Sequence, residues 1–272
     1  MTEDSIRLAV LGYPLHYTRS PELHRAGAAA VGLHAESLAL PTLAESLGER
    51  LAELARDGYR GCNLTNPLKG VALDHVARVS ETARRSRSVN TVGFGPEGAW
   101  GETTDGAGFV NWLRSLGRAP DRERVVLLGA GGAARSIAFA LAGAGASSVV
   151  VGTRRPESAR EAWADIGAAR FVIHRSSEEA AALAECSLVV NATPLESPAE
   201  IAPIETVNAS ALIVDLRYGG QITPWVARGR AMRREAYDGL GLLVYQAREA
   251  LALWTGRDVP IEPLAQAVGW PR

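Results

Sequence analysis

Cysteine is scarce in this chain, and no hydrophobic run is long. The 272 residues include two cysteines, Cys62 and Cys186, which lie far apart in different segments. Two isolated cysteines form neither a disulfide framework nor a zinc-ligand spacing, so we expect a reduced, intracellular protein. No stretch approaches the roughly 18 consecutive apolar residues of a membrane span. The first apolar run is short and bounded by Gly and Pro, which indicates a buried strand rather than a signal peptide.

Excess charge and clustered histidines are also missing. The net charge is -1, so nothing indicates a surface for nucleic acid or membrane. The five histidines show no pairwise ligand spacing, and we expect no metal site. The chain does contain 47% hydrophobic residues, enough for a sizeable core in one large or two smaller domains. A small molecule or a protein is the expected partner.

Strand and helix patterns alternate twice along the chain. Apolar runs of strand length begin near residues 6, 35 and 59, with helical patterns at 20–33, 43–58 and 68–77 between and after them. Residues 88–106 predict two strands around a Pro-Glu-Gly turn. Ser20 is predicted to cap the first helix, with Pro21 at its first position. Such alternation favours an α/β protein with a mostly parallel sheet.

The second alternation follows a predicted helix at 106–117 and a polar stretch at 118–124. It contains five apolar runs of strand length and ends in helical patterns at 240–256 and 261–270. This organisation predicts a second α/β domain. We see no internal repeat and no low-complexity segment.

A glycine-rich turn opens the second domain. Gly129, Gly131 and Ala134 fill the pattern G-x-G-x-x-G/A between an apolar strand and a helix, the context of a dinucleotide site. Gly129 permits the tight turn, Gly131 lets the backbone approach a pyrophosphate, and Ala134 permits close packing. The helix N-terminus favours phosphate. We expect the cofactor to bind Gly129, Ala130, Gly131, Gly132 and Ala133; a packing role for the turn is the alternative.

The end of the next strand indicates which dinucleotide binds. Thr153, Arg154 and Arg155 occupy the place where an NAD site carries an acidic residue. Two guanidinium groups suit a 2′-phosphate, which favours NADP(H), unless both arginines form a solvated surface pair. Thr193 ends a later strand, where it either lies near the nicotinamide or caps a loop.

Polar residues also follow the apolar runs of the first domain. If each lies at a strand end, they converge on one side of the sheet and suit a small ligand rich in hydroxyl groups. Ser20 as a helix cap, Asn90 as a turn residue and Lys69 as an exposed helix lysine are the alternative interpretations. The set comprises Thr18, Ser20, Asn63, Thr65, Lys69, Asn90 and Asp105.

Seven segments together resemble the motifs of the shikimate dehydrogenase family, in the family's order and over nearly the whole chain. They are "GYPLHYTRSPELH", "NLTNPLK", "VNT", "TTDG", "GAGGAAR", "DLRYGGQITP" and "DGLGLLVYQA" with "LWTG". The resemblance implies a substrate domain at 1–105 plus 239–272 and a Rossmann-type NADP domain at 106–238, with the active site in the cleft between them. It implies a cytoplasmic oxidoreductase of chorismate and aromatic amino acid biosynthesis that reversibly reduces 3-dehydroshikimate to shikimate with NADPH.

The resemblance also implies residue roles. Lys69 would donate and accept the proton, paired with Asp105, and an ammonium group suits that task because it stabilises the developing alkoxide. Thr18 and Ser20, helped by Tyr218, would hold the substrate carboxylate. Leu216 and Gly239 would contact the nicotinamide end. The ring hydroxyls would bind Asn63, Thr65, Asn90, Asp105 and Gln246.

Some positions depart from the family's pattern. Tyr17 stands in place of His, Thr18 in place of Ser, Thr103 in place of Asn, and Leu242 in place of Met. Because an added methyl at residue 18 crowds the carboxylate end, quinate or an amino-shikimate is an alternative substrate. A non-catalytic NADP-binding sensor is a third hypothesis, against which Lys69 and Asp105 argue. A homodimer is retained as one candidate assembly.

Overall fold

The computed structural model describes residues 5–164, 166–167 and 169–272, which divide into two compact units. Unit 1 comprises Met1–Gly108 and Leu243–Pro271, and unit 2 comprises Phe109–Leu242 with Arg272. The borders after Gly108 and Leu242 fall inside helices, in α5 (Asp105–Ser115) and in α11 (Leu240–Thr255). Each unit is built on its own six-stranded sheet.

The sheet of unit 1 is mostly parallel, as predicted. β1 is parallel to β2 and β3, β4 is parallel to β6, and β5 is antiparallel to β3 and β6. The predicted hairpin at residues 88–106 is formed by β5 and β6, and Gly98, the first residue of β6 after the turn, has a φ of +96°. In sheet order the strands are β2 (His34–Pro41), β1 (Ser5–Gly12), β3 (Gly61–Leu64), β5 (Thr91–Gly95), β6 (Gly98–Glu102) and β4 (Arg78–Val79).

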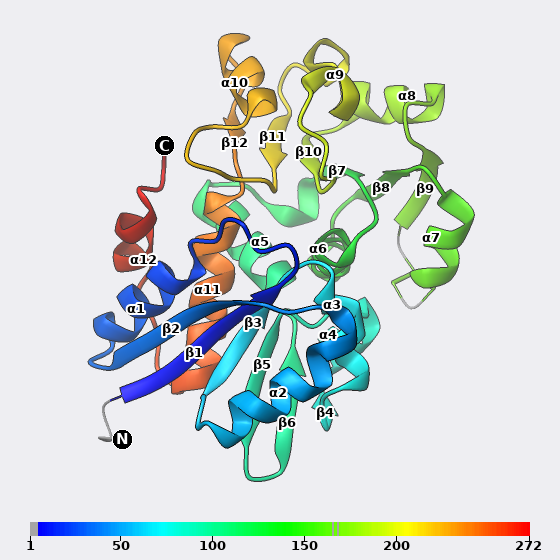
Figure 1. Cartoon of the computed structure of the whole chain (residues 1–272). Coiled ribbons are helices and arrows are strands. Elements are labelled where there is room, and N and C mark those ends of the chain that lie inside the picture. Colours follow the sequence, from blue (N-terminus) through cyan, green and yellow to red (C-terminus); the bar gives the residue numbers. More distant parts are fainter. Residues whose placement is uncertain (1–4, 165, 168) are drawn as a thin grey trace. The chain divides into compact units, whose positions relative to one another are not determined.

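Helices cover both faces of this sheet (Figure 1). On one face, α2 (Leu47–Arg56) buries Leu47, Leu51 and Leu54, which recur at helical spacing and pack with strand residues such as Cys62. On the other, α1 (Ser20–Ala30) contacts α12 (Ile261–Val268). Trp254 of α11 joins this face to the sheet, because its indole Nε1 donates to the Val92 carbonyl at 3.0 Å.

Two local predictions in unit 1 need correction. Ser20 is the first residue of α1 rather than its cap; Arg19 occupies the cap position, and no side chain caps the helix there. The helix predicted at 68–77 is a short α3 (Leu68–Val71) followed by a 3₁₀ turn, Ala72–Asp74. The sequence patterns also missed β4 and the short α4 (Glu81–Ser86), which Ser80 caps through its hydroxyl.

The sheet of unit 2 is wholly parallel, with the order β12-β11-β10-β7-β8-β9. Counted from β7 as the first strand, this is the doubly wound order 3-2-1-4-5-6 read from the other edge, so the predicted Rossmann-type fold is confirmed. The strands are near-continuous apolar runs, as expected for a sheet buried on both faces. They are β7 (Arg124–Leu128), β8 (Ser148–Thr153), β9 (Ala169–Ile173), β10 (Leu188–Asn191), β11 (Leu212–Asp215) and β12 (Ala236–Tyr237).

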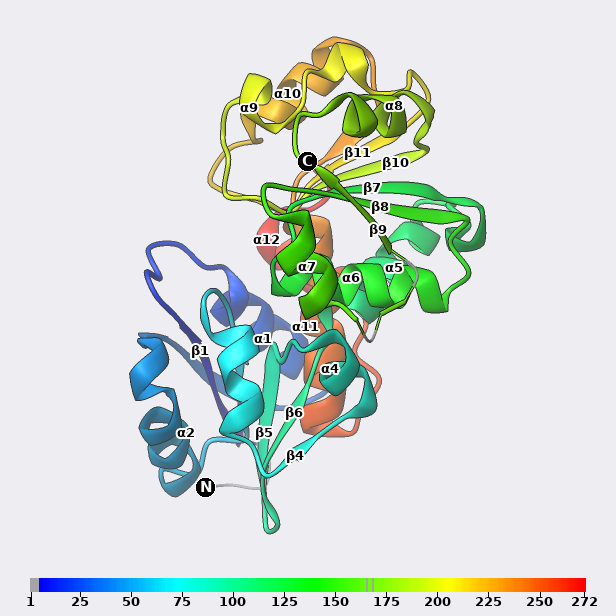
Figure 2. The same cartoon turned by 90° about the vertical axis from the view of Figure 1, so that its right-hand side faces the viewer.

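Helices lie on both faces of this second sheet as well (Figure 2). α6 (Gly132–Gly143) and α7 (Pro156–Ala162) lie on one face. On the other are α8 (Ser177–Glu185), α9 (Pro198–Ile201) and α10 (Pro224–Ala231). In this fold, ligands usually bind outside the carboxyl ends of the strands.

The structure also bears on the features that the composition left scarce: long apolar helices, cysteines and clusters of metal ligands. No helix among them is long and apolar enough to cross a membrane. Cys62 and Cys186 are free and buried. Burial raises the pKa of the Cys62 thiol, and it raises the pKa of Cys186 to about 11, so neither carries the thiolate that reacts readily. Within the same residues, no group of three or more His, Cys, Asp or Glu side chains is arranged to hold a metal ion.

Candidate active site

Lys69 lies near the carboxyl end of β3 in the unit 1 sheet, where it forms an ion pair with Asp105. β3 ends at Leu64, a turn follows, and Lys69 falls in the first turn of α3. Its carbonyl accepts a hydrogen bond from Val89 N at 2.8 Å. The Nζ of Lys69 donates to Asp105 Oδ2 at 2.5 Å, and the side chains are 18% and 6% exposed. Lys69 is also the only lysine in the sequence.

Asn90 holds the other oxygen of the same carboxylate. Its Nδ2 donates to Asp105 Oδ1 at 2.8 Å, with further acceptors in Thr104 Oγ1 at 3.0 Å and Gln246 Oε1 at 3.3 Å. Its Oδ1 accepts from Thr104 N at 2.7 Å. Asn90 precedes β5 instead of following a strand, but β5 runs antiparallel to β3 and β6, so it begins at the edge where they end. Both oxygens of Asp105 are thus fixed by hydrogen bonds.

A buried histidine extends this network. Asn63 lies within β3, and its Nδ2 donates to the Asn90 carbonyl at 3.0 Å and to Thr91 Oγ1 at 3.1 Å. Its Oδ1 lies 2.8 Å from Nε2 of His24, whose Nδ1 lies 2.8 Å from Ser37 Oγ. Burial lowers the pKa of His24 to about 4, so the imidazole is neutral near pH 7. Sequence reasoning assigned His24 no role, although the segment "SPELH" contains it.

The remaining predicted substrate residues are placed separately. Thr18 and Ser20 bond to each other, with the hydroxyl oxygens 3.3 Å apart. Thr65 follows β3, and its backbone N donates to the Leu11 carbonyl at 2.9 Å. Tyr218 belongs to unit 2. Hydrogen bonds therefore bring together Asn63, Lys69, Asn90, Asp105 and Gln246, while none within the described residues joins the Thr18–Ser20 pair to them.

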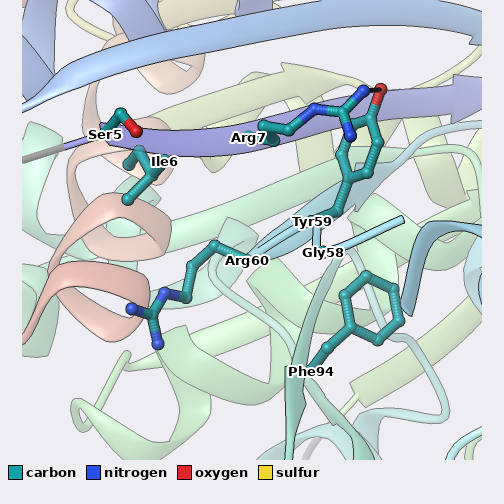
Figure 3. Close-up of a pocket in the computed structure, with 7 residues that line it drawn as sticks. All are labelled: Ser5, Ile6, Arg7, Gly58, Tyr59, Arg60 and Phe94. Atoms are coloured by element: carbon teal, nitrogen blue, oxygen red, sulfur yellow. Dashed lines mark hydrogen bonds between the residues drawn. The ribbon is translucent and has the colours of Figure 1, made fainter. Parts of the chain in front are cut away.

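A hollow lies at the opposite end of the unit 1 strands (Figure 3). Its volume is about 180 Å³, and it contains none of the predicted site residues. The Arg7 guanidinium lies 4.3 Å from the centroid of the Tyr59 ring and donates to the Asp57 carbonyl at 2.7 Å. That arginine is thus held by neighbouring groups. The lining residues are Ser5, Ile6, Arg7, Gly58, Tyr59, Arg60 and Phe94.

The glycine-rich turn of unit 2 is tight at Gly129 and open to space at Gly131. Gly129 has a φ of +104°, and its backbone N donates to the Gly152 carbonyl at 2.8 Å. A Cβ there would lie 3.0 Å from the Ala192 oxygen, so the tight turn requires glycine. A Cβ at Gly131, by contrast, would meet nothing within 4 Å. Open space therefore adjoins the backbone at the N-terminus of α6, where free N–H groups favour phosphate.

The predicted 2′-phosphate residues follow β8. β8 ends at Thr153, and Pro156 begins α7. Arg154 and Arg155 between them are exposed. Within the part of the chain that the structure describes, neither arginine forms an ion pair with an acidic side chain. Both guanidinium groups are therefore available to an anion.

The residues predicted at the nicotinamide end follow three strands of the unit 2 sheet: Thr193 follows β10, Leu216 follows β11 and Gly239 follows β12. Thr193 Oγ1 donates to Asn191 Oδ1 at 2.6 Å, so its hydroxyl does cap the loop. Leu216 N donates to the Asn191 carbonyl at 2.9 Å. A Cβ at Gly239 would lie 2.1 Å from the Leu216 oxygen, so this close approach requires glycine. Leu216 and Gly239 are thus neighbours.

Asp215, at the end of β11, is fully buried with one oxygen unsatisfied. Its Oδ1 accepts from Asn191 Nδ2 at 3.0 Å and from Arg217 N at 3.1 Å. Its Oδ2 and the Thr223 hydroxyl are neighbours, but among the described residues neither has a hydrogen-bond partner of good geometry. Burial raises the pKa of Asp215, against the nearby Thr223 hydroxyl and the hydrogen bonds from Arg217 and Asn191, which lower it. The charged form is therefore disfavoured in the folded protein.

We expect Asp215→Asn to stabilise the protein at pH 7 by about 1 kcal/mol, because an amide removes the buried charge and supplies a donor for Thr223. A raised pKa means that the folded state holds the proton more tightly than the unfolded state. Wild-type stability therefore falls as the pH rises from the ordinary value of 3.8 to the raised one, and stays lower above it. The increase in the free energy of unfolding caused by Asp215→Asn should be larger at pH 7 than at pH 4.

Urea unfolding of both proteins at the two pH values measures this difference. Asp121→Asn makes the same charge change at an exposed position of unit 2 and should leave stability nearly unchanged. A variant at Asp215 that is less stable than the wild type at pH 7 would contradict the interpretation.

Comparison with protein families finds matches along most of the chain. A profile described as "Shikimate dehydrogenase substrate binding domain" matches residues 10–92. One described as "Shikimate / quinate 5-dehydrogenase" matches residues 114–234, and "Shikimate 5'-dehydrogenase C-terminal domain" matches residues 239–268. The three matches follow one another along the chain without overlap.

Individual proteins are similar over nearly their full length. The chain is 37% identical over 269 residues to "Shikimate dehydrogenase (NADP(+))" of Xanthomonas campestris pv. campestris (strain 8004), covering 96% of this chain and 95% of that protein. It is 39% identical over 256 residues to the enzyme of the same name from Acidiphilium cryptum (strain JF-5), covering 92% and 91%. These identities concern whole proteins and not single motifs.

Solved structures agree in fold. Shikimate 5-dehydrogenase of Thermus thermophilus, in complex with NADP(H) and shikimate, superposes with a TM-score of 0.86 at 35% identity and covers 97% of this chain and 98% of its own. The ligand-free 5-ketofructose reductase of a Gluconobacter species reaches 0.83 at 27% identity, covering 97% and 98%. The same fold is therefore found with a second enzyme name.

Proposed function

Because the chain belongs to the shikimate dehydrogenase family, we propose that it catalyses the reversible reduction of 3-dehydroshikimate to shikimate with NADPH. The observation that carries the proposal is the ion pair of Lys69 and Asp105, with both carboxylate oxygens held. We further propose a cytoplasmic enzyme of chorismate and aromatic amino acid biosynthesis. The two free, buried cysteines are compatible with a reducing compartment.

Lys69 is the proposed proton carrier. Bound NADPH supplies the hydride for the substrate carbonyl. As that oxygen gains negative charge, the ammonium group of Lys69 stabilises it and gives it a proton. In the direction of oxidation the same amine takes the proton from the hydroxyl. Asp105 orients the amine through the 2.5 Å contact, so that Lys69 is positioned before the substrate binds.

The substrate is proposed to bind at the same edge of the unit 1 sheet. Thr18 and Ser20 offer neighbouring hydroxyls for its carboxylate, helped by Tyr218. Asn90, Thr65 and Gln246 are proposed for the ring hydroxyls, together with Asp105. The N–H groups of the Asn63 and Asn90 side chains already donate inside the protein, so both residues can only accept from a ligand hydroxyl.

The cofactor is proposed to be NADP(H). The open space at Gly131 and the N-terminus of α6 fit the pyrophosphate, and the exposed Arg154 and Arg155 fit the 2′-phosphate. Leu216 and Gly239 are proposed at the nicotinamide, beside Thr193. Sequence and structure thus supply a group for each part of the cofactor.

Turnover by the wild-type protein tests the proposal directly. We expect NADP⁺ to be reduced with shikimate, and kcat/KM for shikimate to exceed that for quinate by about tenfold or more, because a misplaced polar group is strongly rejected. Absorbance of the reduced cofactor measures both rates.

Each alternative predicts a different outcome of that assay. Faster turnover of quinate would move the protein to the second substrate and direct attention to Tyr17 and Thr18. Tight binding of NADP⁺ without turnover of either compound would contradict the enzymatic proposal and favour the sensor.

A further inference from the structure

The buried polar network around Asn63 forms a continuous chain of hydrogen bonds that ends on Asp105. Consecutive contacts measure 2.8 Å from Ser37 to His24, 2.8 Å from His24 to Asn63 and 3.1 Å from Asn63 to Thr91. Thr91 Oγ1 then lies 3.0 Å from Asn90 Oδ1, and Asn90 Nδ2 lies 2.8 Å from Asp105. Each of these side chains is at most 7% exposed, so water cannot replace a lost partner easily.

The donor and the acceptor of each hydrogen bond in this series are determined by groups that can only donate or only accept. The Asp105 carboxylate only accepts, and Thr104 N–H only donates, so the amide of Asn90 must turn its Nδ2 to Asp105 and its Oδ1 to Thr104. The Asn90 carbonyl only accepts, so Asn63 must turn its Nδ2 to it and its Oδ1 to His24.

The same reasoning assigns the tautomer of His24. Nε2 faces an acceptor and therefore carries the hydrogen, and the neutral ring then accepts at Nδ1 from the Ser37 hydroxyl. All five bonds run in one direction, from Ser37 toward Asp105. Such chains polarise their members cooperatively, so the last donor depends on the first.

Packing contacts also hold the His24 ring in place, in addition to its two hydrogen bonds. The ring is fully buried on α1, and the edge contact with Trp254 has a centroid distance of 5.4 Å and an interplanar angle of 89°. Trp254 is itself anchored to the sheet through Val92. The imidazole is therefore a rigid donor aimed at Asn63.

We propose that His24 is a positioning residue for the reaction. Its Nε2–H satisfies the Oδ1 of Asn63, so that this amide is held by His24 on one side and by the Asn90 carbonyl on the other; through Thr91 and Asn90 it supports the carboxylate that holds Lys69. Without this donor, the buried Oδ1 of Asn63 loses its partner, and the amide can shift away from the Asn90 carbonyl and Thr91, which loosens the contacts that follow. The expected effect on catalysis rests on the proposed function. The direction of the hydrogen bonds does not depend on it.

Two variants at His24 separate the effect of its N–H donor from the effect of its side-chain volume. His24→Gln keeps an N–H donor at a similar reach, whereas His24→Met keeps an apolar side chain and no donor. We expect His24→Met to lower kcat by about tenfold or more, with KM for shikimate changed by less than about threefold, because the geometry of the proton carrier changes more than the binding groups. His24→Gln should restore kcat to within about threefold of wild type.

Leu51→Ala is the matched control, because it opens a cavity in the core of the same unit and leaves the polar network intact. It should lower the melting temperature without lowering kcat. If His24→Met lowers the melting temperature in the same way and leaves kcat unchanged, or if His24→Gln loses as much kcat as His24→Met, the proposal is wrong.

Nitrogen NMR of histidine-labelled wild type tests the same inference without turnover or a variant. We expect His24 to show a protonated Nε2 and an unprotonated Nδ1 near pH 7. An imidazolium or the opposite tautomer would overturn the proposal. If the wild type shows no turnover, the proposed function fails while this spectrum still decides the role of His24 in the chain of bonds.

Discussion

Lys69→Met is expected to lower kcat for shikimate oxidation by about a thousandfold, because a positioned acid–base group typically contributes factors of this size. The methionine side chain keeps the apolar stem and removes the proton carrier. KM for shikimate should change far less than kcat, since Lys69 acts on the reacting oxygen. Steady-state rates with saturating NADP⁺ measure both constants, and direct shikimate binding shows that the site is intact.

Lys69→Arg separates charge from proton transfer. An arginine keeps the positive charge beside Asp105 but does not deprotonate in a protein, so it cannot accept the hydroxyl proton. We expect kcat for Lys69→Arg to stay within about tenfold of the low value of Lys69→Met. A methionine variant that keeps more than about a tenth of wild-type kcat would contradict the role assigned to Lys69.

Replacing both arginines after β8 should change the choice of cofactor. We expect Arg154→Gln with Arg155→Gln to lower kcat/KM for NADP⁺ by about a hundredfold or more, because two charge-assisted contacts to the 2′-phosphate are lost. The value for NAD⁺, which lacks that phosphate, should change by less than about threefold. Initial rates with each cofactor at fixed shikimate give the ratio.

Arg160→Gln, an exposed arginine on α7 of the same unit, is the control for a general loss of positive charge. It should leave the ratio of kcat/KM for NADP⁺ to kcat/KM for NAD⁺ unchanged. An equal fall with NADP⁺ and NAD⁺ in the double variant would show that the arginines are solvated surface residues and do not recognise the phosphate.

Features that depend on local sequence could be predicted before the structure was known. The apolar strand of β7, the turn at Gly129 and the helix α6 follow from residues within one βα unit, and local periodicity decides such units. The hairpin of β5 and β6 follows from its turn for the same reason. The doubly wound order of unit 2 then follows from the alternation of strands and helices, since connections are short and right-handed.

Features that depend on contacts between distant residues could not be predicted in this way. β4 and β12 are two residues long and exist only because β6 and β11 offer an edge to pair with. Asn90 reaches the site only because β5 is antiparallel, which its own sequence does not show. His24 meets Asn63 across 39 positions, so no spacing rule identifies it as a partner.

The pairing of the single lysine with Asp105 also decides how the protein responds to amine-directed chemistry. Besides the α-amino group, Nζ of Lys69 is the sole primary amine that an acylating dye, a crosslinking ester or an aldehyde-coated bead can modify. Reagents that label most proteins at many exposed lysines would here act on the site itself. The extent of acylation then reports how well a bound ligand shields one atom, and coupling to a surface is better directed at the carboxylates.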